Sequence, residues 1–133
     1  MATTKTRNNG RWTEARHKSF ITSALRGAHG KWGVKTDVKK SARVSTGRYR
    51  CACCSVVGPA TLPPVGAGRR RNNAAVDHIN PVVDPEVGFV DWDTYINRMF
   101  LEAEGYQVLC WVCHGVKTRD EREVRTLTRK KNK

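Results

Sequence analysis

Residues 106–118 read YQVLCWVCHGVKT, and this stretch decides how the chain is expected to fold. Cys110 and Cys113 form a C-x-x-C pair, whose spacing lets a tight turn present two sulfur atoms to one metal ion. His114 follows the second cysteine directly. It is therefore a ligand of the same ion, a residue without a role, or part of a different site, and the rest of the sequence has to decide.

A second C-x-x-C pair, Cys51 and Cys54, lies upstream. Four thiolates in two such pairs suit tetrahedral Zn²⁺, so we expect the two pairs to hold one structural zinc. Cys53 competes with Cys54 for a place on the ion, but its C-x-C spacing suits the turn less well, and we expect a neutral thiol at the edge of the site. With four cysteines on the zinc, His114 is left for another task.

The composition indicates a small protein that needs a metal and a polyanionic partner. The chain has 133 residues, of which 38% are apolar, so its hydrophobic core must be small and must rely on disulfides, a metal or a partner. The formal net charge is +13, which favours a nucleic acid as that partner.

The sequence also indicates a compartment. No apolar run approaches the roughly 18 residues of a membrane-spanning helix, and the stretch MATTKTRNNGRWTE lacks the apolar centre of a signal peptide. We therefore expect a cytoplasmic protein with no membrane partner. Because that compartment is reducing, we expect its five cysteines to be metal ligands rather than disulfides.

The uneven distribution of charge along the chain predicts two domains. Residues 1–50 hold 13 Lys and Arg against two acidic residues, whereas residues 51–100 hold 4 against 5 and residues 101–133 hold 8 against 5. We predict a basic N-terminal arm over residues 1–50, which contacts phosphate groups, and a second domain over residues 51–133.

Within the arm, we predict one helix that begins after Thr13 as its N-cap, runs to about Arg26 and is ended by Gly27 and Gly30. Residues 31–50 show no firm period and are expected to be a basic connector.

The sequence of the second domain predicts short strands and two helices. AAVDHI (residues 74–79) and YQVLC (residues 106–110) read as strands, and a last helix is expected from about Cys113 to Leu127. Asp91 is expected to cap a helix whose apolar stripe packs in the core rather than stacking on bases, formed by Trp92, Tyr95, Ile96, Met99 and Phe100. The predicted fold class is α+β.

Asp77 and His78 stand side by side on the first of these strands. If zinc clamps the two cysteine pairs together, this strand is brought to the start of the last helix. A site for a hard cation could then be built from Asp77 and His114, with His78 beside it as a base. His17 and His29 lie in the basic arm and are expected to be surface residues.

C-x-x-C, then VDHINP, then YQVLCWVCHGVKT resembles, in this order, the motifs of the phage-type HNH endonucleases, which share a ββα-metal fold. The resemblance covers residues 51–54, 76–81 and 106–118. It implies that Asp77 and His114 bind a catalytic divalent ion and that His78 is the general base. It also implies that the four paired cysteines hold a structural zinc knuckle.

The activity implied by the resemblance is hydrolysis of DNA phosphodiester bonds, by nicking or double-strand cleavage, to 5′-phosphate and 3′-hydroxyl ends. The catalytic ion would be Mg²⁺ or Mn²⁺, with Ni²⁺ as a further option, and the partner would be double-stranded DNA. Small phage HNH proteins commonly act with the terminase during genome packaging, while others are mobile homing enzymes, and the resemblance does not separate these roles. We expect a phage-encoded protein in the host cell cytoplasm. We also expect a monomer or weak dimer. Arg69, Arg70 and Arg71 either clamp the duplex or lie in a solvated loop, and Lys117 either meets a phosphate or is a solvated helix lysine.

One position departs from the family pattern. The motif carries an asparagine nine residues before its last histidine, and here that position is Gly105. Asn97 is out of register and is expected to be an exposed helix residue. The missing role falls to Glu104, to backbone groups or to nothing. The departure favours an alternative function, a non-catalytic zinc-stabilised protein that binds DNA as an accessory.

Overall fold

The computed structural model describes residues 3–132, which form an α+β protein with four α-helices and three small sheets in that range. The chain divides between Trp32 and Gly33 into two compact units. The sequence predicted a division after residue 50 instead. No helix in the described range is long and apolar enough to cross a membrane.

The first unit contains helix α1 (Glu14–His29). The predicted N-cap is confirmed, because Thr13 Oγ1 accepts a hydrogen bond from the backbone N–H of Arg16 at 3.2 Å. The helix continues through Gly27, where the sequence predicted its end, and stops at Gly30. A glycine inside a helix costs only about 1 kcal/mol relative to alanine, which the following residues offset by continuing the hydrogen-bonded turns.

The prediction of a basic connector over residues 31–50 was wrong. Helix α2 (Gly33–Ala42) leads into a hairpin of β1 (Arg43–Ser45) and β2 (Arg48–Arg50), and β2 pairs on its other side with β3 (Val57–Pro59). Val38 is buried, and Val34 and Ala42 share its face at a spacing of four residues. This apolar stripe packs against the β6–β7 pair described next, so α2 belongs to the second unit.

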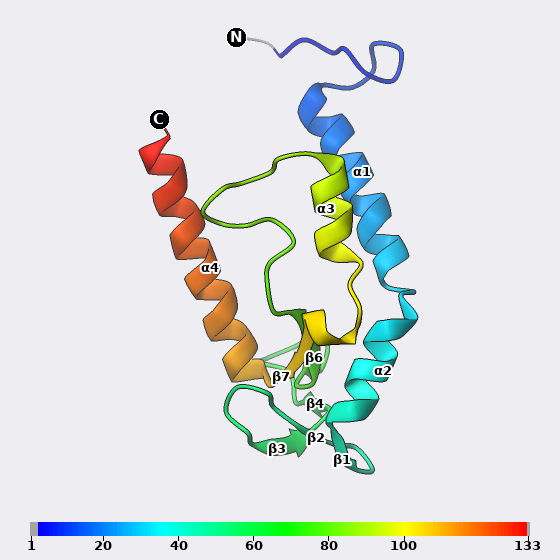
Figure 1. The fold of residues 1–133 in the computed structure, drawn as a ribbon, viewed down its shortest axis with the longest axis vertical. Helices are drawn as coiled ribbons and strands as arrows, with labels where there is room; N and C mark the ends of the chain where they lie inside the picture. Colours follow the sequence, from blue (N-terminus) through cyan, green and yellow to red (C-terminus); the bar gives the residue numbers. More distant parts are fainter. Residues whose placement is uncertain (1–2, 133) are drawn as a thin grey trace. The chain divides into compact units, whose positions relative to one another are not determined.

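Strands β6 (Ala75–His78) and β7 (Tyr106–Leu109) pair antiparallel, with Ala75 opposite Leu109 and His78 opposite Tyr106. Both strands confirm the sequence prediction. Helix α4 (Trp111–Lys131) follows β7 almost at once, as Figure 1 shows, so its start lies beside the strand pair. The helix begins two residues earlier than predicted and ends four residues later.

Between β6 and β7, the chain forms helix α3 (Trp92–Met99) and a 3₁₀ turn, η1 (Ala103–Gly105). Asp91 caps α3 as predicted, accepting from the backbone N–H of Thr94 at 2.7 Å. Tyr95 and Met99 are buried, and the rings of Trp92 and Tyr95 meet edge to face with centroids 5.7 Å apart. The prediction that this stripe packs in the core is therefore confirmed for Tyr95 and Met99, whereas Ile96 is exposed.

The remaining sheet pairs β4 (Thr61–Leu62) with β5 (Arg71–Asn72). The buried apolar residues of the second unit are few, which agrees with the small core expected from composition. They lie mainly on the β6–β7 pair and on the helices beside it: Val38, Cys51, Ala74, Ala75, Tyr95, Met99, Tyr106, Val108 and Leu109.

Candidate metal centres

The two C-x-x-C pairs meet in one cluster, as predicted. The sulfur atoms of Cys51, Cys54, Cys110 and Cys113 all lie within 4.8 Å of one another. Cys54 Sγ and Cys110 Sγ are 3.8 Å apart, about the spacing of two sulfurs each about 2.3 Å from a tetrahedral zinc ion. The group could thus hold a metal ion, and its four thiols suit zinc. Cys53 is exposed and lies outside this group.

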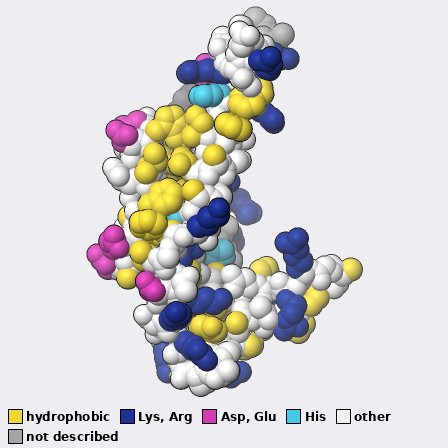
Figure 2. All heavy atoms as spheres, turned by 90° about the vertical axis from the view of Figure 1, so that its right-hand side faces the viewer, with side chains coloured by type: hydrophobic (Ala, Val, Ile, Leu, Met, Phe, Trp, Pro, Cys, Tyr) yellow, Lys and Arg dark blue, Asp and Glu magenta, His cyan; other side chains and the backbone are white. Residues whose placement is uncertain are grey.

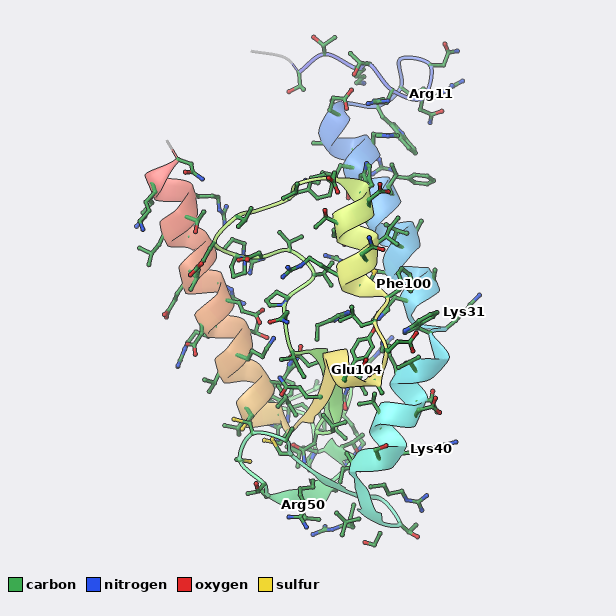
Figure 3. The ribbon with its side chains drawn as sticks, viewed as in Figure 1. Arg11, Lys31, Lys40, Arg50, Phe100 and Glu104 are labelled. Carbon is green, nitrogen blue, oxygen red and sulfur yellow. The ribbon has the colours of Figure 1, made fainter. Side chains whose placement is uncertain are left out.

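Backbone contacts fix the geometry of the first pair. After Cys51 the chain turns back, with Ser55 in the left-handed region (φ 64°) and its N–H donating to Cys51 O at 3.0 Å. The N–H of Ala52 donates to Val108 O at 2.8 Å, which attaches this turn to β7. Figure 3 shows sulfur atoms at the beginning of α4, where the second pair lies.

The environment of the cluster lowers the pKa of one thiol and raises the pKa of others. Burial alone would raise the pKa of Cys51, but hydrogen bonds from the backbone of Cys110, Cys54 and Cys53 lower it to about 6. The hydrogen bond that Cys113 makes with the Cys110 sulfur, together with burial, raises the pKa of Cys113. One thiolate is therefore favoured near neutral pH, and filling the cluster with metal must release protons from the others.

Beside this cluster, Asp77 of β6 and His114 of α4 face each other. Asp77 Oδ1 and His114 Nε2 are 3.7 Å apart, too far for a hydrogen bond. An octahedral ion about 2.1 Å from its ligands spaces adjacent ligand atoms about 3.0 Å apart and opposite ones about 4.2 Å apart. A small adjustment of either side chain would therefore let both atoms contact one ion. The aspartate oxygen is a ligand type that Mg²⁺ and Mn²⁺ prefer, whereas the imidazole nitrogen favours a transition ion such as Ni²⁺.

Lys117 is not a solvated helix lysine. Its Nζ donates to the carbonyl oxygen of His78 at 2.9 Å and lies 2.9 Å from Asp77 Oδ2. That oxygen is buried and accepts no well-formed hydrogen bond, so the contact is an ion pair with poor hydrogen-bond angles. Lys117 also pairs with Glu121 on the next turn of α4. Burial would lower the pKa of Lys117, but Glu121 and Asp77 more than offset this, so its pKa is raised and it stays charged.

Glu121 was not singled out from the sequence. Its only sequence signal is the spacing of four residues from Lys117, which is common on exposed helices and rarely points to a site.

The imidazole of His78 is held by the end of α3. His78 Nε2 lies 2.8 Å from Met99 O, and the same carbonyl accepts a hydrogen bond from Tyr106 Oη at 2.7 Å. The ring also packs against Tyr106, with centroids 4.9 Å apart. A carbonyl can only accept, so Nε2 carries a hydrogen and the lone pair of a neutral His78 is on Nδ1. Asp77, rather than His78, is the residue of β6 that approaches His114.

The absence of a side chain at position 105 has a steric reason. A Cβ atom added there would lie 2.6 Å from Leu101 Cδ1 and 2.9 Å from Leu101 Cβ, so an asparagine does not fit without a shift of the turn. The carbonyl oxygen of Gly105 accepts a hydrogen bond from Ile79 N–H at 3.0 Å, directly after His78. A backbone group thus holds the end of β6. Glu104 is exposed on η1 (Figure 3), and Asn97 is exposed on α3 as expected.

The three arginines before β6 differ in their contacts. Arg70 Nε donates to Thr61 Oγ1 at 2.9 Å and Arg71 Nε donates to Pro63 O at 2.8 Å, so both hold the loop between β4 and β5. The Arg71 guanidinium also lies 5.3 Å from the ring centre of Trp111, which joins this loop to the start of α4. Arg69 is exposed.

A groove runs along α4 from the candidate ion site. It is lined by residues that recur at helical spacing on one face: Trp111, His114, Gly115, Thr118, Arg119 and Arg122. Because it contains His114 at one end and arginines at the other, a phosphate chain lying in it would pass the proposed ion site.

Comparison with known protein families gives no matching family model, and comparison with curated proteins and with solved structures gives no match. The function is therefore inferred from the motifs and from the geometry they adopt.

Proposed function

We propose that the chain is a metal-dependent HNH DNA endonuclease with a ββα-metal core, which hydrolyses phosphodiester bonds to 5′-phosphate and 3′-hydroxyl ends. The observation that supports this best is the approach of Asp77 Oδ1 to His114 Nε2 at 3.7 Å. These side chains come from a strand and a helix that are far apart in the sequence, and they meet beside a cluster of four thiols. A DNA-binding zinc module alone does not require this second pair.

In the proposed mechanism, Asp77 and His114 would hold a divalent ion, Mg²⁺ or Mn²⁺, which would stabilise the negative charge that develops during hydrolysis. His78 accepts a proton from the attacking water at Nδ1, because its Nε2 is engaged by Met99 O. Met99 O and Tyr106 keep the imidazole in this tautomer and orientation. Zinc on the four cysteines stabilises the start of α4, and so the position of His114.

The proposed substrate is double-stranded DNA. Lys and Arg side chains are spread over the lower part of Figure 2, where the small sheets of the second unit lie, and further arginines line the groove on α4. These charges are suited to the phosphate backbone, which carries no sequence information, so weak sequence preference is expected. Arg69 is the best placed of the three loop arginines to meet DNA, since Arg70 and Arg71 are engaged within the protein.

One observation favours the alternative function, a zinc-stabilised DNA-binding accessory. Lys117 already neutralises Asp77, and a carboxylate whose charge is compensated has a weaker attraction for a cation. An accessory protein would bind DNA equally well with or without a divalent ion in solution.

The deciding experiment incubates supercoiled plasmid with zinc-loaded protein and Mg²⁺ or Mn²⁺. We expect nicking by the wild type, and a loss of about 100-fold or more in rate for His78→Ala and Asp77→Ala. His17→Ala, on α1, is the matched control and keeps the wild-type rate. Absence of nicking with every divalent ion, while DNA binding persists, would establish the accessory instead. Equal nicking by His78→Ala would remove His78 as the base, and a parallel RNA substrate tests the class of nucleic acid.

A further inference from the structure

Glu121 stands at the far end of a series of contacts that leads to Asp77. We infer that Glu121 is a positioning residue. Together with the carbonyl oxygen of His78, it fixes the Lys117 ammonium, which holds Asp77 Oδ2 and thereby turns Asp77 Oδ1 toward His114. The inference rests on the proposed function for the existence of the ion site.

The contacts come from both β6 and α4, so the position of the Lys117 ammonium is fixed by two elements of the fold. Lys117 receives a side-chain oxygen and a backbone oxygen from β6, and a carboxylate from its own helix. His114, Lys117 and Glu121 are spaced by three and four residues, so they share the face of α4 that meets β6. The exposed fractions of the Lys117 and Glu121 side chains are 23% and 29%, so solvent screens their pairing only in part.

The two oxygens of Asp77 have different neighbours. Lys117 approaches Oδ2, whereas His114 faces Oδ1. The ammonium therefore does not lie between the two proposed ligand atoms, and an ion bound there would not have to displace it. It orients the carboxylate as a hydrogen-bonded partner orients a metal ligand.

A purely electrostatic role and a positioning role predict opposite effects of removing Lys117 on divalent-ion binding, so the inference can be tested. If Lys117 only competed electrostatically with the ion, removing its charge would tighten divalent binding. If Lys117 positions Asp77, removing it weakens binding despite the gain in negative potential. Removing the charge of Glu121 weakens binding in either case, so Lys117→Met is the variant that separates the two.

The experiment titrates the full-length, zinc-loaded protein with Mn²⁺ and follows free Mn²⁺ by electron paramagnetic resonance. Asp77→Ala identifies the binding that belongs to the site. We expect Glu121→Gln and Lys117→Met each to weaken this binding by about 10-fold, the lower end for partners of metal ligands. The double variant should be no weaker than the weaker single one, because Glu121 acts through Lys117. Glu123→Gln removes the same charge from an exposed position on α4 and should leave the Kd unchanged.

Circular dichroism and zinc content establish that each variant is folded. Tighter Mn²⁺ binding by Lys117→Met, unchanged binding by Glu121→Gln, or additive effects in the double variant would each overturn the inference. If Lys117→Met does not fold, Lys117→Gln removes the same charge and takes its place in the comparison. Asp77-dependent Mn²⁺ binding without nicking would remove the proposed function and leave the positioning role standing, whereas no such binding at all would overturn both.

Discussion

The carbonyl oxygen of Gly105 accepts a hydrogen bond from the backbone N–H of Ile79 at 3.0 Å, immediately after His78 in the chain. The same residue packs so closely on Leu101 that no side chain fits at position 105. The position where the HNH pattern carries an asparagine is thus filled by backbone, and the end of β6 is held without an amide side chain.

Introducing the asparagine of the HNH pattern at position 105 should therefore destabilise the protein. We expect Gly105→Asn to lower the free energy of unfolding by roughly 1–3 kcal/mol, because the new Cβ overlaps Leu101. Urea denaturation measures the change. Gly27→Asn is the control, since a Cβ there meets nothing within 4 Å. A Gly105→Asn protein as stable as the control would contradict this steric explanation.

The four-thiol cluster predicts that four of the five cysteines are needed for zinc binding and that Cys53 is not. We expect Cys113→Ser to lose most bound zinc and to melt at a markedly lower temperature, because a structural metal contributes directly to folding. Cys53→Ser should retain an equimolar amount of zinc and the wild-type melting temperature, since Cys53 lies outside the cluster. Atomic absorption and thermal denaturation test both statements. Zinc loss in Cys53→Ser would assign that thiol to the ion.

Tyr106 predicts a dependence of stability on pH. Burial raises its pKa, so the folded protein keeps the phenol protonated at a pH where the unfolded chain ionises. Its contribution is complete below the unfolded pKa of about 10 and is lost as pH rises through the higher folded pKa.

We expect Tyr106→Phe to be less stable by about 1 kcal/mol at neutral pH, because the hydrogen bond to Met99 O is removed. The difference in free energy of unfolding between Tyr106→Phe and the wild type should shrink between about pH 9 and 11. This range covers about one pH unit on either side of the unfolded pKa. Urea denaturation at several pH values measures it. A difference that stays constant across this range would show that Tyr106 does not titrate differently in the two states.

The groove along α4 predicts how DNA binding responds to salt. Each phosphate contact removed should lower the slope of log K against log salt by about 0.9. We expect that reduction for Arg119→Ala and for Arg122→Ala, which line the groove. Arg125→Ala, an exposed arginine on α4 that does not line the groove, is the matched control. Equal slopes for all three variants would mean that DNA does not lie along this groove.

Local signals in the sequence predicted β6, β7, α3, α4 and the thiol cluster, because strand alternation, helix caps and C-x-x-C spacing are set by neighbouring residues. Helix α2 was missed because its apolar stripe of Val34, Val38 and Ala42 is short and lies among lysines. Nothing along the chain indicates that Glu121 and Asp77 share Lys117, since that contact exists only after α4 meets β6. The reason for Gly105 is likewise tertiary, because it depends on where Leu101 lies.

Helix α4 has 21 residues and is therefore about 31 Å long at 1.5 Å per residue. His114 lies in its first turn, whereas its last turn carries Arg129, Lys130 and Lys131. With base pairs about 3.4 Å apart along the duplex, that helix spans about nine of them. For the proposed nuclease, the cut site would then lie near one edge of the protected DNA, so a footprint should extend much further to one side of the broken bond than to the other.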